Sequence, residues 1–337
     1  RDLHRAKTLF PYTTLFRSEV NRCHSCLKDL RSGGNFCAAC SKKIFGKINF
    51  SARLNFDLPG LTASADGGPR RISISGAQTK FSAKIEDGMI VLTDRGGTYI
   101  LKPSLDRSFE NYGDMPANEH VTMQMARQIF KIPTAESALI YFGSGEPLYL
   151  TRRFDVLANG DRCVQNDFAQ IAGLTPEENG EDYKYTALSY EGIAKLMKLH
   201  VSAYPVAAEN FFKTILFNYL VCNGDAHVKN FSLRESETPG VYELTPAYDL
   251  LNTALHIKSE SSRTALDLFQ DEIDFRTDFY YIANQALERF CIPKNGFHNV
   301  ISKHKEFVYA PDYEKLKAEF DDLLETDRCT HSMEYRW

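Results

Sequence analysis

The run Asn223-Gly-Asp-Ala-His-Val-Lys-Asn-Phe231 is the most informative stretch of this chain. It places Asp225 five positions before Asn230, and a second carboxylate follows in the pair Tyr248-Asp249. These side chains supply one carboxylate that can orient a hydroxyl group and two oxygen donors that suit a magnesium ion. Asn-Gly-Asp is also an ordinary turn and Tyr-Asp an ordinary loop pair, so the run alone fits a purely structural role equally well.

The spacing of Asp225 and Asn230 equals that between the catalytic-loop Asp and the metal-binding Asn of protein kinases. Phosphoryl transfer needs a carboxylate that orients the attacking hydroxyl, and oxygen ligands for the magnesium ions that neutralise the triphosphate. Asp225 can fill the first role, and Asn230 with Asp249 the second. In the same loop, His227 is expected to orient the backbone by hydrogen bonding, and Lys229 can neutralise the transferring phosphoryl group.

The composition is that of a soluble globular protein with room for one large core or two lobes. Of the 337 residues 43% are hydrophobic and 25% charged, and the net charge is −4. This balance gives no overall attraction to DNA or to an anionic membrane. No apolar run has the length of a membrane span and no signal-peptide pattern is visible, so the cytoplasm is the expected compartment.

The opening segment, RDLHRAKTLFPYTTLFRS, differs in character from everything that follows. It lacks an initiator Met, shows no clear period, and resembles a translated sequencing-adapter fragment fused to a truncated gene. We therefore expect residues 1–18 to be an artefactual, disordered segment and the natural N-terminus to be missing.

Four of the eight cysteines fall in two closely spaced pairs. Cys23 and Cys26 form one Cys-x-x-Cys pair, ten residues intervene, and Cys37 and Cys40 form the other. Such pairs let four thiolates converge on one zinc ion, which would be structural because no coordination position stays open. Reduced, metal-free cysteines are the alternative. We expect residues 19–50 to form a four-cysteine, zinc-ribbon-like segment whose loss leaves catalysis intact, because it precedes the other motifs.

The rest of the chain divides into a β-rich part and a helical part. In residues 51–160, alternation predicts strands at 81–85, 89–93, 98–102, 137–142 and 147–152. Helical spacing after Pro116 predicts one helix there, from about Ala117 to Phe130. In residues 161–337, helices are expected at 190–199, 209–222, 277–291 and 296–325. The predicted fold class is α+β, a two-lobed protein-kinase-like fold preceded by the small four-cysteine segment.

Lys102 and Glu119 are candidates for the nucleotide side of the site. Lys102 ends a predicted strand, and Glu119 lies seventeen residues later in the predicted helix. In kinases a strand lysine binds the nucleotide phosphates and is held by a helix glutamate. Taken alone, the two residues also fit an exposed lysine and a first-turn glutamate. The downstream order of Asp225, Asn230 and Asp249 favours the functional interpretation.

Together these segments resemble the HipA family, whose members are bacterial serine/threonine-protein kinases that act as toxins of toxin–antitoxin systems. The matching motifs run in family order from about residue 50 to 325. They are Ile-Ser-Gly-Ala-Gln-Thr-Lys, Ile-Leu-Lys-Pro, Asn-Glu before a helix, Arg-Arg-Phe-Asp, Gly-Asp-Ala-His-Val-Lys-Asn-Phe-Ser and Leu-Thr-Pro-Ala-Tyr-Asp-Leu. The resemblance implies the HipA-like form of the kinase fold, in a short version without the N-terminal subdomain of longer members.

The resemblance implies specific roles on the nucleotide side. The loop that contains Ser75, Gly76 and Gln78 would cover the nucleotide, and Ser75 or Ser73 would be autophosphorylated. This loop has one glycine, so as a bare pattern it is a weak signal, although its N–H groups and hydroxyls can cradle phosphates. Lys102 would bind the phosphates of ATP.

The resemblance also implies the remaining chemistry and the partners. Asp225 would be the catalytic base or orienter, and Asn230 and Asp249 would hold Mg²⁺. The substrates would be the chain itself and a protein target, an aminoacyl-tRNA synthetase. The partners would be a DNA-binding, HipB-like antitoxin and a separate small protein that corresponds to the missing subdomain. No direct contact with nucleic acid or membrane is expected.

Two other functions fit the same residues. One is a kinase-fold regulatory subunit that binds an antitoxin with little turnover, and the other is a small-molecule phosphotransferase, since a fold does not fix its substrate. One motif also departs from the family, because Gln165-Asn-Asp167 stands where Gln-Glu-Asp is common. The acidic role of that turn therefore rests on Asp167 alone.

Overall fold

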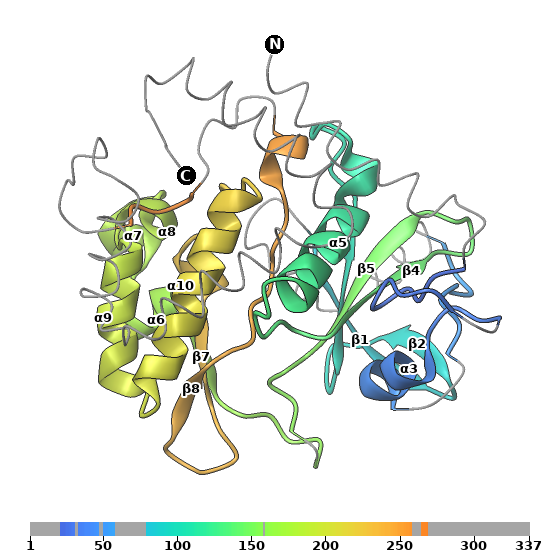
Figure 1. Cartoon of the computed structure of the whole chain (residues 1–337), viewed down its shortest axis with the longest axis horizontal. Coiled ribbons are helices and arrows are strands. Elements are labelled where there is room, and N and C mark those ends of the chain that lie inside the picture. The colour runs from blue at the N-terminus through green and yellow to red at the C-terminus, as the bar shows by residue number, and fades with distance from the viewer. Residues whose placement is uncertain are drawn as a thin grey trace.

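The computed structural model describes residues 21–30, 33–46, 50–57, 79–157, 159–257 and 264–268. The opening segment 1–18 and the helices expected at 277–291 and 296–325 lie outside these residues, so those expectations stay predictions. The described residues form two lobes (Figure 1). One is a sheet with a long helix against it, and the other is a group of helices with a small sheet.

An antiparallel sheet is the main element of the first lobe. The strand order is β2-β1-β3-β5-β4. The strands are β1 (Phe81–Glu86), β2 (Met89–Leu92), β3 (Tyr99–Pro103), β4 (Ser137–Tyr141) and β5 (Pro147–Arg152). Alternate side chains meet in one apolar cluster, in which Ala83, Leu101, Leu148 and Leu150 are fully buried. This packing fixes the register of β3, the strand that carries Lys102.

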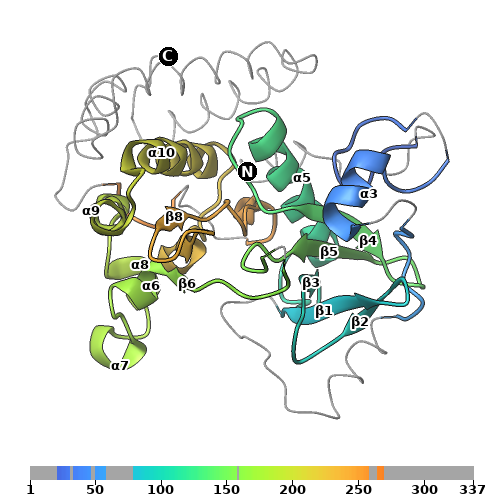
Figure 2. The ribbon, with the colours of Figure 1, turned by 90° about the horizontal axis from the view of Figure 1, so that it is seen from below.

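Helix α5 (Met115–Gln128) packs on β4 and β5 and lies between the sheet and the second lobe (Figures 1 and 2). The short 3₁₀ helix η1 (Tyr112–Asp114) leads into it, and Pro116 stands in its first turn, where no N–H donor is needed. Eleven of its fourteen residues are buried, so neighbouring elements enclose the helix on most sides.

The second lobe is built on two helices, α9 (Tyr190–His200) and α10 (Tyr204–Leu220). Its core contains the fully buried side chains of Phe168, Ile193 and Phe211. A small antiparallel sheet of order β6-β7-β8 completes it, with β6 (Gln165–Asp167), β7 (Ser232–Glu235) and β8 (Tyr242–Leu244). The short helices are α6 (Phe168–Ile171), α7 (Pro176–Asn179), α8 (Tyr183–Thr186), η2 (Val228–Asn230) and η3 (Thr253–Leu255).

The elements differ from the sequence expectations at their ends and in the small sheet. Helix α10 begins at Tyr204 rather than Glu209, because Pro205 can occupy the first turn. The strands of the small sheet were not predicted, since three or four residues are too few for alternation to stand out. Within the described ranges, no helix is long and apolar enough to cross a membrane.

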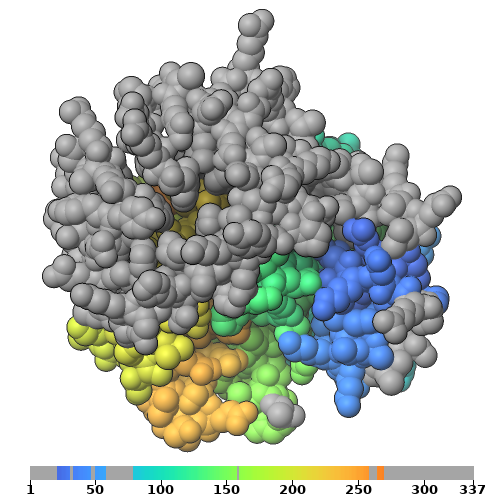
Figure 3. All heavy atoms as spheres, viewed as in Figure 1, coloured from blue at the N-terminus to red at the C-terminus, as the bar shows by residue number. Residues whose placement is uncertain are grey.

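The cysteine-containing segment packs against the first lobe (Figure 3). Its helix α3 (Ala38–Phe45) places Ile44 and Phe45 in the same apolar cluster as the five-stranded sheet. The hydroxyl of Tyr99 in β3 donates to the carbonyl of Ile44 at 2.8 Å. The segment and the sheet therefore share one hydrophobic core.

Candidate active site

The loop from Asn223 to Asn230 joins α10 to β7 and is anchored by buried hydrogen bonds. The backbone N–H of Asn223 donates to the carbonyl of Asn218 in α10 at 2.8 Å. Further along, the carbonyl of Ala226 accepts the hydroxyl of Tyr190 at 3.0 Å. These contacts fix the backbone, so the loop presents its polar side chains in set positions.

Asp225 is the exposed carboxylate of this loop, with 43% of its side chain accessible. Its Oδ1 accepts the hydroxyl of Tyr185 at 2.5 Å, and Nε2 of His227 lies 3.9 Å from the same oxygen. The rings of Tyr185 and His227 meet edge to face. A carboxylate that already accepts one hydroxyl group, and that solvent can reach, can orient the hydroxyl of an acceptor.

His227 and Lys229 occupy different positions around Asp225. Burial lowers the pKa of His227, although Asp225 nearby favours its charged form. The backbone N–H of His227 donates to Oδ1 of Asn230 at 3.1 Å, whereas the predicted orienting role of the His227 side chain stays a prediction. Lys229 contributes its carbonyl, which accepts the hydroxyl of Tyr248 at 3.0 Å. A role of its ammonium group toward a phosphoryl group stays a prediction.

Asp249 is the centre of a charged cluster between the lobes. Its φ of 62° is left-handed, a conformation that costs about 1–3 kcal/mol in residues other than glycine and that recurs at functional sites. Oδ1 accepts Nζ of Lys102 at 2.5 Å, and Oδ2 accepts Nζ of Lys80 at 3.3 Å and Nδ2 of Asn230 at 3.1 Å. Burial would raise the pKa of Asp249, but Lys102 and Lys80 hold it below its usual range. The carboxylate is therefore ionised.

Lys102 and Glu119 form a buried ion pair beside Asp249. Nζ of Lys102 lies 2.5 Å from Oε1 of Glu119, and their side chains are 6% and 1% exposed. Burial disfavours the Lys102 ammonium, yet Asp249 and Glu119 together raise its pKa. Burial also raises the pKa of Glu119, against the opposing effect of Lys102. The structure thus brings together the lysine and glutamate that the sequence pairs.

Three further residues of the site were not among the functional residues predicted from the sequence. Lys80 ends the quoted motif Ile-Ser-Gly-Ala-Gln-Thr-Lys, and Tyr185 has the pattern of an ordinary core aromatic. Asn118 precedes Glu119, and its amide exchanges hydrogen bonds with the backbone of Asn252, at 2.8 and 3.1 Å. These bonds tie α5 to the segment that follows Asp249, a contact between residues too distant in sequence for any local pattern to show.

Asn230 and Asp249 carry oxygen atoms of the kind that magnesium binds, although Asn230 turns its Nδ2, and not its Oδ1, toward Asp249. Mg²⁺ prefers oxygen ligands and usually binds through one or two protein side chains plus substrate phosphates. Asp249 offers an ionised carboxylate. Oδ1 of Asn230 accepts one N–H and, as a carbonyl oxygen, has a second lone pair for a cation. The predicted covering loop with Ser73, Ser75, Gly76 and Gln78 lies outside the described residues, so its contacts with a nucleotide stay a prediction.

The four clustered cysteines converge on one point. The sulfur atoms of Cys23, Cys26, Cys37 and Cys40 all lie within 4.8 Å of one another. The sulfurs of Cys26 and Cys37 are 3.9 Å apart, close to the edge of about 3.8 Å that four Zn–S bonds of ~2.3 Å give a tetrahedron. None of the four is in a disulfide. The cluster therefore has the ligand type and spacing of a metal centre.

Comparisons with known proteins show which sequences this chain resembles. The family model described as HipA-like C-terminal domain matches residues 72–309. The Sinorhizobium fredii protein Y4dM, named as a candidate kinase, is 32% identical over 210 residues, which cover 57% of this chain and 47% of that protein. The serine/threonine-protein kinase toxin HipA of Shewanella oneidensis is 28% identical over 249 residues, which cover 68% of this chain and 54% of that protein. The chain thus spans about half the length of these two relatives.

A solved structure shows the same fold. A chain in the complex of HipA, HipB and operator DNA from Shewanella oneidensis MR-1 aligns with a TM-score of 0.54 and 20% identity. The alignment covers 81% of this chain and 71% of that chain. The two-lobed, kinase-like architecture predicted from the sequence is therefore confirmed.

Proposed function

The chain belongs to the family of HipA-like C-terminal domains, and on this premise we propose that it transfers the γ-phosphoryl group of ATP to a serine or threonine hydroxyl of a protein. One observation carries the proposal. Lys102, Glu119 and Asp249 form a buried charged cluster, while the exposed Asp225 lies on the loop that also supplies Asn230 to Asp249. A nucleotide side and an acceptor side therefore meet in one site.

On the nucleotide side, the lysines would face the phosphates of ATP, and the side chains with oxygen ligands would face the magnesium ion. Lys102 would bind the phosphates, and Glu119 would hold its ammonium group in place. Asn230 and Asp249 would bind magnesium, which when present neutralises the charge that develops on the transferring group. Lys80, now on Asp249, can follow the phosphates because its side chain is 23% exposed.

On the acceptor side, Asp225 would accept a hydrogen bond from the substrate hydroxyl and receive its proton. One such hydroxyl belongs to this chain. Ser75 precedes Lys80 by five residues, a chain length of at most ~18 Å, so the sequence allows its hydroxyl to approach the cluster. We propose Ser75, or else Ser73, as the site of autophosphorylation, which would inhibit the kinase because a second phosphate would compete with those of ATP.

The partners follow from the relatives. One relative is named as a toxin, and the matched structure holds HipA together with HipB and operator DNA. We propose that this chain also acts in a toxin–antitoxin system, with a HipB-like antitoxin and an aminoacyl-tRNA synthetase as target.

Incubation of the purified protein with γ-labelled ATP and a bacterial lysate tests this function. Label on the chain itself and on one other protein is the expected result. Label on a metabolite would instead indicate a small-molecule phosphotransferase. No transfer, with tight antitoxin binding, would indicate a regulatory subunit. Either of the last two outcomes overturns the proposal.

A further inference from the structure

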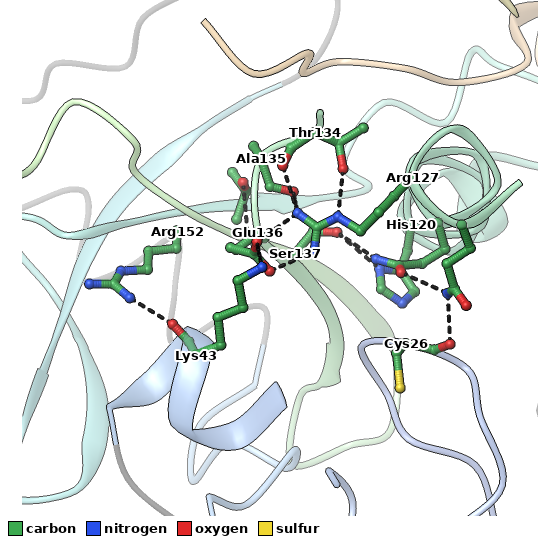
Figure 4. A network of polar contacts seen from close by, with 12 residues as sticks. Cys26, Lys43, His120, Arg127, Thr134, Ala135, Glu136, Ser137 and Arg152 are labelled. Carbon is green, nitrogen blue, oxygen red and sulfur yellow. Dashed lines mark hydrogen bonds and ion pairs between the residues drawn. The ribbon is translucent and has the colours of Figure 1, made fainter. Parts of the chain in front are cut away.

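The cysteine-containing segment is in direct contact with helix α5, the helix that carries Glu119. The carbonyl of Cys26 accepts Nε2 of Gln128, at the end of α5, at 2.8 Å. The carbonyl of His24 accepts the backbone N–H of Leu139 in β4, also at 2.8 Å. The first Cys-x-x-Cys turn is thereby joined to α5 and to β4, the strand on which α5 packs, and Figure 4 shows Cys26 close to the end of α5.

The contact includes a hydrophobic part. Leu27, which follows Cys26 with a left-handed φ of 60°, packs against the buried cluster of Ala117, Val121, Leu139 and Leu255. In an α-helix, positions four, seven and eleven residues apart lie on one face. Ala117, Val121 and Gln128 therefore share the face of α5 that meets the cysteine segment.

Glu119 lies on the opposite face of the same helix. It is two positions from Ala117, a rotation of about 200°. Met123 and Ala126 share this second face and pack toward Phe217 and Leu250 of the second lobe. Helix α5 is therefore held between the cysteine segment on one side and the active site on the other.

A second set of contacts joins α3 to the end of α5. Lys43 of α3 and Arg127 of α5 both bind Glu136, at 2.5 and 2.6 Å (Figure 4). Arg152 of β5 donates to the carbonyl of Lys43 at 2.6 Å. Two hydrogen bonds join the Cys-x-x-Cys turns, from the backbone N–H of His24 to the carbonyl of Asn35 at 2.8 Å and from the N–H of Cys37 to Sγ of Cys23 at 3.3 Å. The described part of the segment has one short helix and no sheet of its own, so metal–thiolate bonds would add the strongest link between the turns.

We propose that the four-cysteine centre binds zinc and acts as a positioning element for α5, which in turn fixes Glu119 against Lys102 for nucleotide binding. Without the metal, the two turns loosen and the face of Ala117 and Val121 loses the part of its cover that Leu27 provides. The helix can then shift, and the contact between Glu119 and Lys102 weakens. The nucleotide part of this inference rests on the proposed kinase function, whereas the helix part does not. It replaces the expectation that catalysis survives loss of the segment.

The first experiment measures zinc content, exchange of backbone amides in α5, and calorimetric affinity for a Mg²⁺-bound, non-hydrolysable ATP analogue. Wild-type protein should contain one zinc per chain. The Cys40→Ser variant should lose zinc, exchange the amides of α5 faster, and bind the analogue about tenfold more weakly, a coupling of ordinary size. The Cys163→Ser variant, which changes an isolated cysteine, should match the wild type in all three.

A double-mutant cycle separates positioning from general damage. If the centre acts through Glu119, then Glu119→Gln combined with Cys40→Ser should bind the analogue no more weakly than Glu119→Gln alone. Multiplied losses would overturn the proposal. Leu27→Ala covers the case in which Cys40→Ser does not fold, since it keeps all four thiolates. It should retain zinc and still loosen α5.

Unchanged amide exchange in α5 after zinc removal overturns the positioning claim whether or not the protein binds nucleotide. Failure of the zinc-loaded wild type to bind the analogue would count against the proposed function instead. A wild-type protein that contains no zinc when freshly prepared under reducing conditions overturns the metal assignment.

Discussion

The two halves of the candidate site differ in how their charges are balanced. Lys102, Glu119 and Asp249 are 6%, 1% and 17% exposed, and their charges balance once Lys80, which also binds Asp249, is counted. Asp225 is 43% exposed, and its Oδ1 accepts the hydroxyl of Tyr185. The first group can stabilise the folded protein as well as bind a nucleotide. The second is open because its proposed partner, an acceptor hydroxyl, comes from outside the site.

This difference has consequences for mutants. Removing one member of a buried ion cluster leaves the others unpaired in a low-dielectric site, which costs about 3–5 kcal/mol. Removing the charge of an exposed carboxylate costs little stability. Loss of activity should therefore come with loss of stability on the nucleotide side and without it on the acceptor side.

The largest effect is expected from Asp225→Asn. Phosphoryl transfer should fall by about a thousandfold, because the amide cannot take up the acceptor's proton. The thermal unfolding midpoint should stay within about 1 °C of the wild type, since the side chain is exposed. Label transfer from ATP and a thermal melt check both parts. Near-normal transfer by this variant would show that the catalytic assignment is wrong.

Lys102→Met should reduce transfer by about a hundredfold and also lower the unfolding free energy by about 3 kcal/mol. The loss of transfer and the loss of stability have the same cause, because Glu119 and Asp249 lose the ammonium group that both of them bind. Lys80→Met is the matched control, because its ammonium is 3.3 Å from Asp249 and its side chain is 23% exposed. It should cost much less stability in chemical denaturation. Equal losses of stability in Lys102→Met and Lys80→Met would contradict the difference between buried and exposed charges.

The smallest effect is expected from Tyr185→Phe. The phenol hydroxyl occupies Oδ1 of Asp225, so an acceptor hydroxyl competes with it. Removal of one such hydrogen bond, worth about 1 kcal/mol net, should raise transfer at low acceptor concentration about fivefold. Affinity for ATP should not change. A fall in transfer would mean that Tyr185 positions Asp225 instead of competing with its substrate.

The sequence was sufficient for the main sheet, for α5 and for four residues of the charged cluster, but not for the small sheet or for Lys80. The strands of the main sheet and α5 follow from periodicity, because they are long enough for alternation or helical spacing to show. Lys102, Glu119, Asn230 and Asp249 were found from their order and spacing, and the structure brings all four together. Their roles, like the domain boundaries at residues 50 and 160, stay predictions.

What the sequence did not show depends on contacts between distant residues. Tyr185 reaches Asp225 across 40 positions, and Gln128 reaches Cys26 across 102. No local pattern encodes such pairs, since each residue is ordinary in its own segment. The cysteine segment therefore looked independent in sequence, although it covers one face of α5.

The central claim is that the cluster around Asp249 is a site for ATP with magnesium. Calorimetric titration of the ATP analogue into wild type and Asp249→Asn, each with and without Mg²⁺, tests it most directly. The account predicts that the wild type binds at least about tenfold more tightly with Mg²⁺, and that Asp249→Asn loses this difference because a charged oxygen ligand is gone. The claim would be contradicted if the two proteins bound the analogue equally in Mg²⁺, or if the affinity of the wild type were the same with and without Mg²⁺.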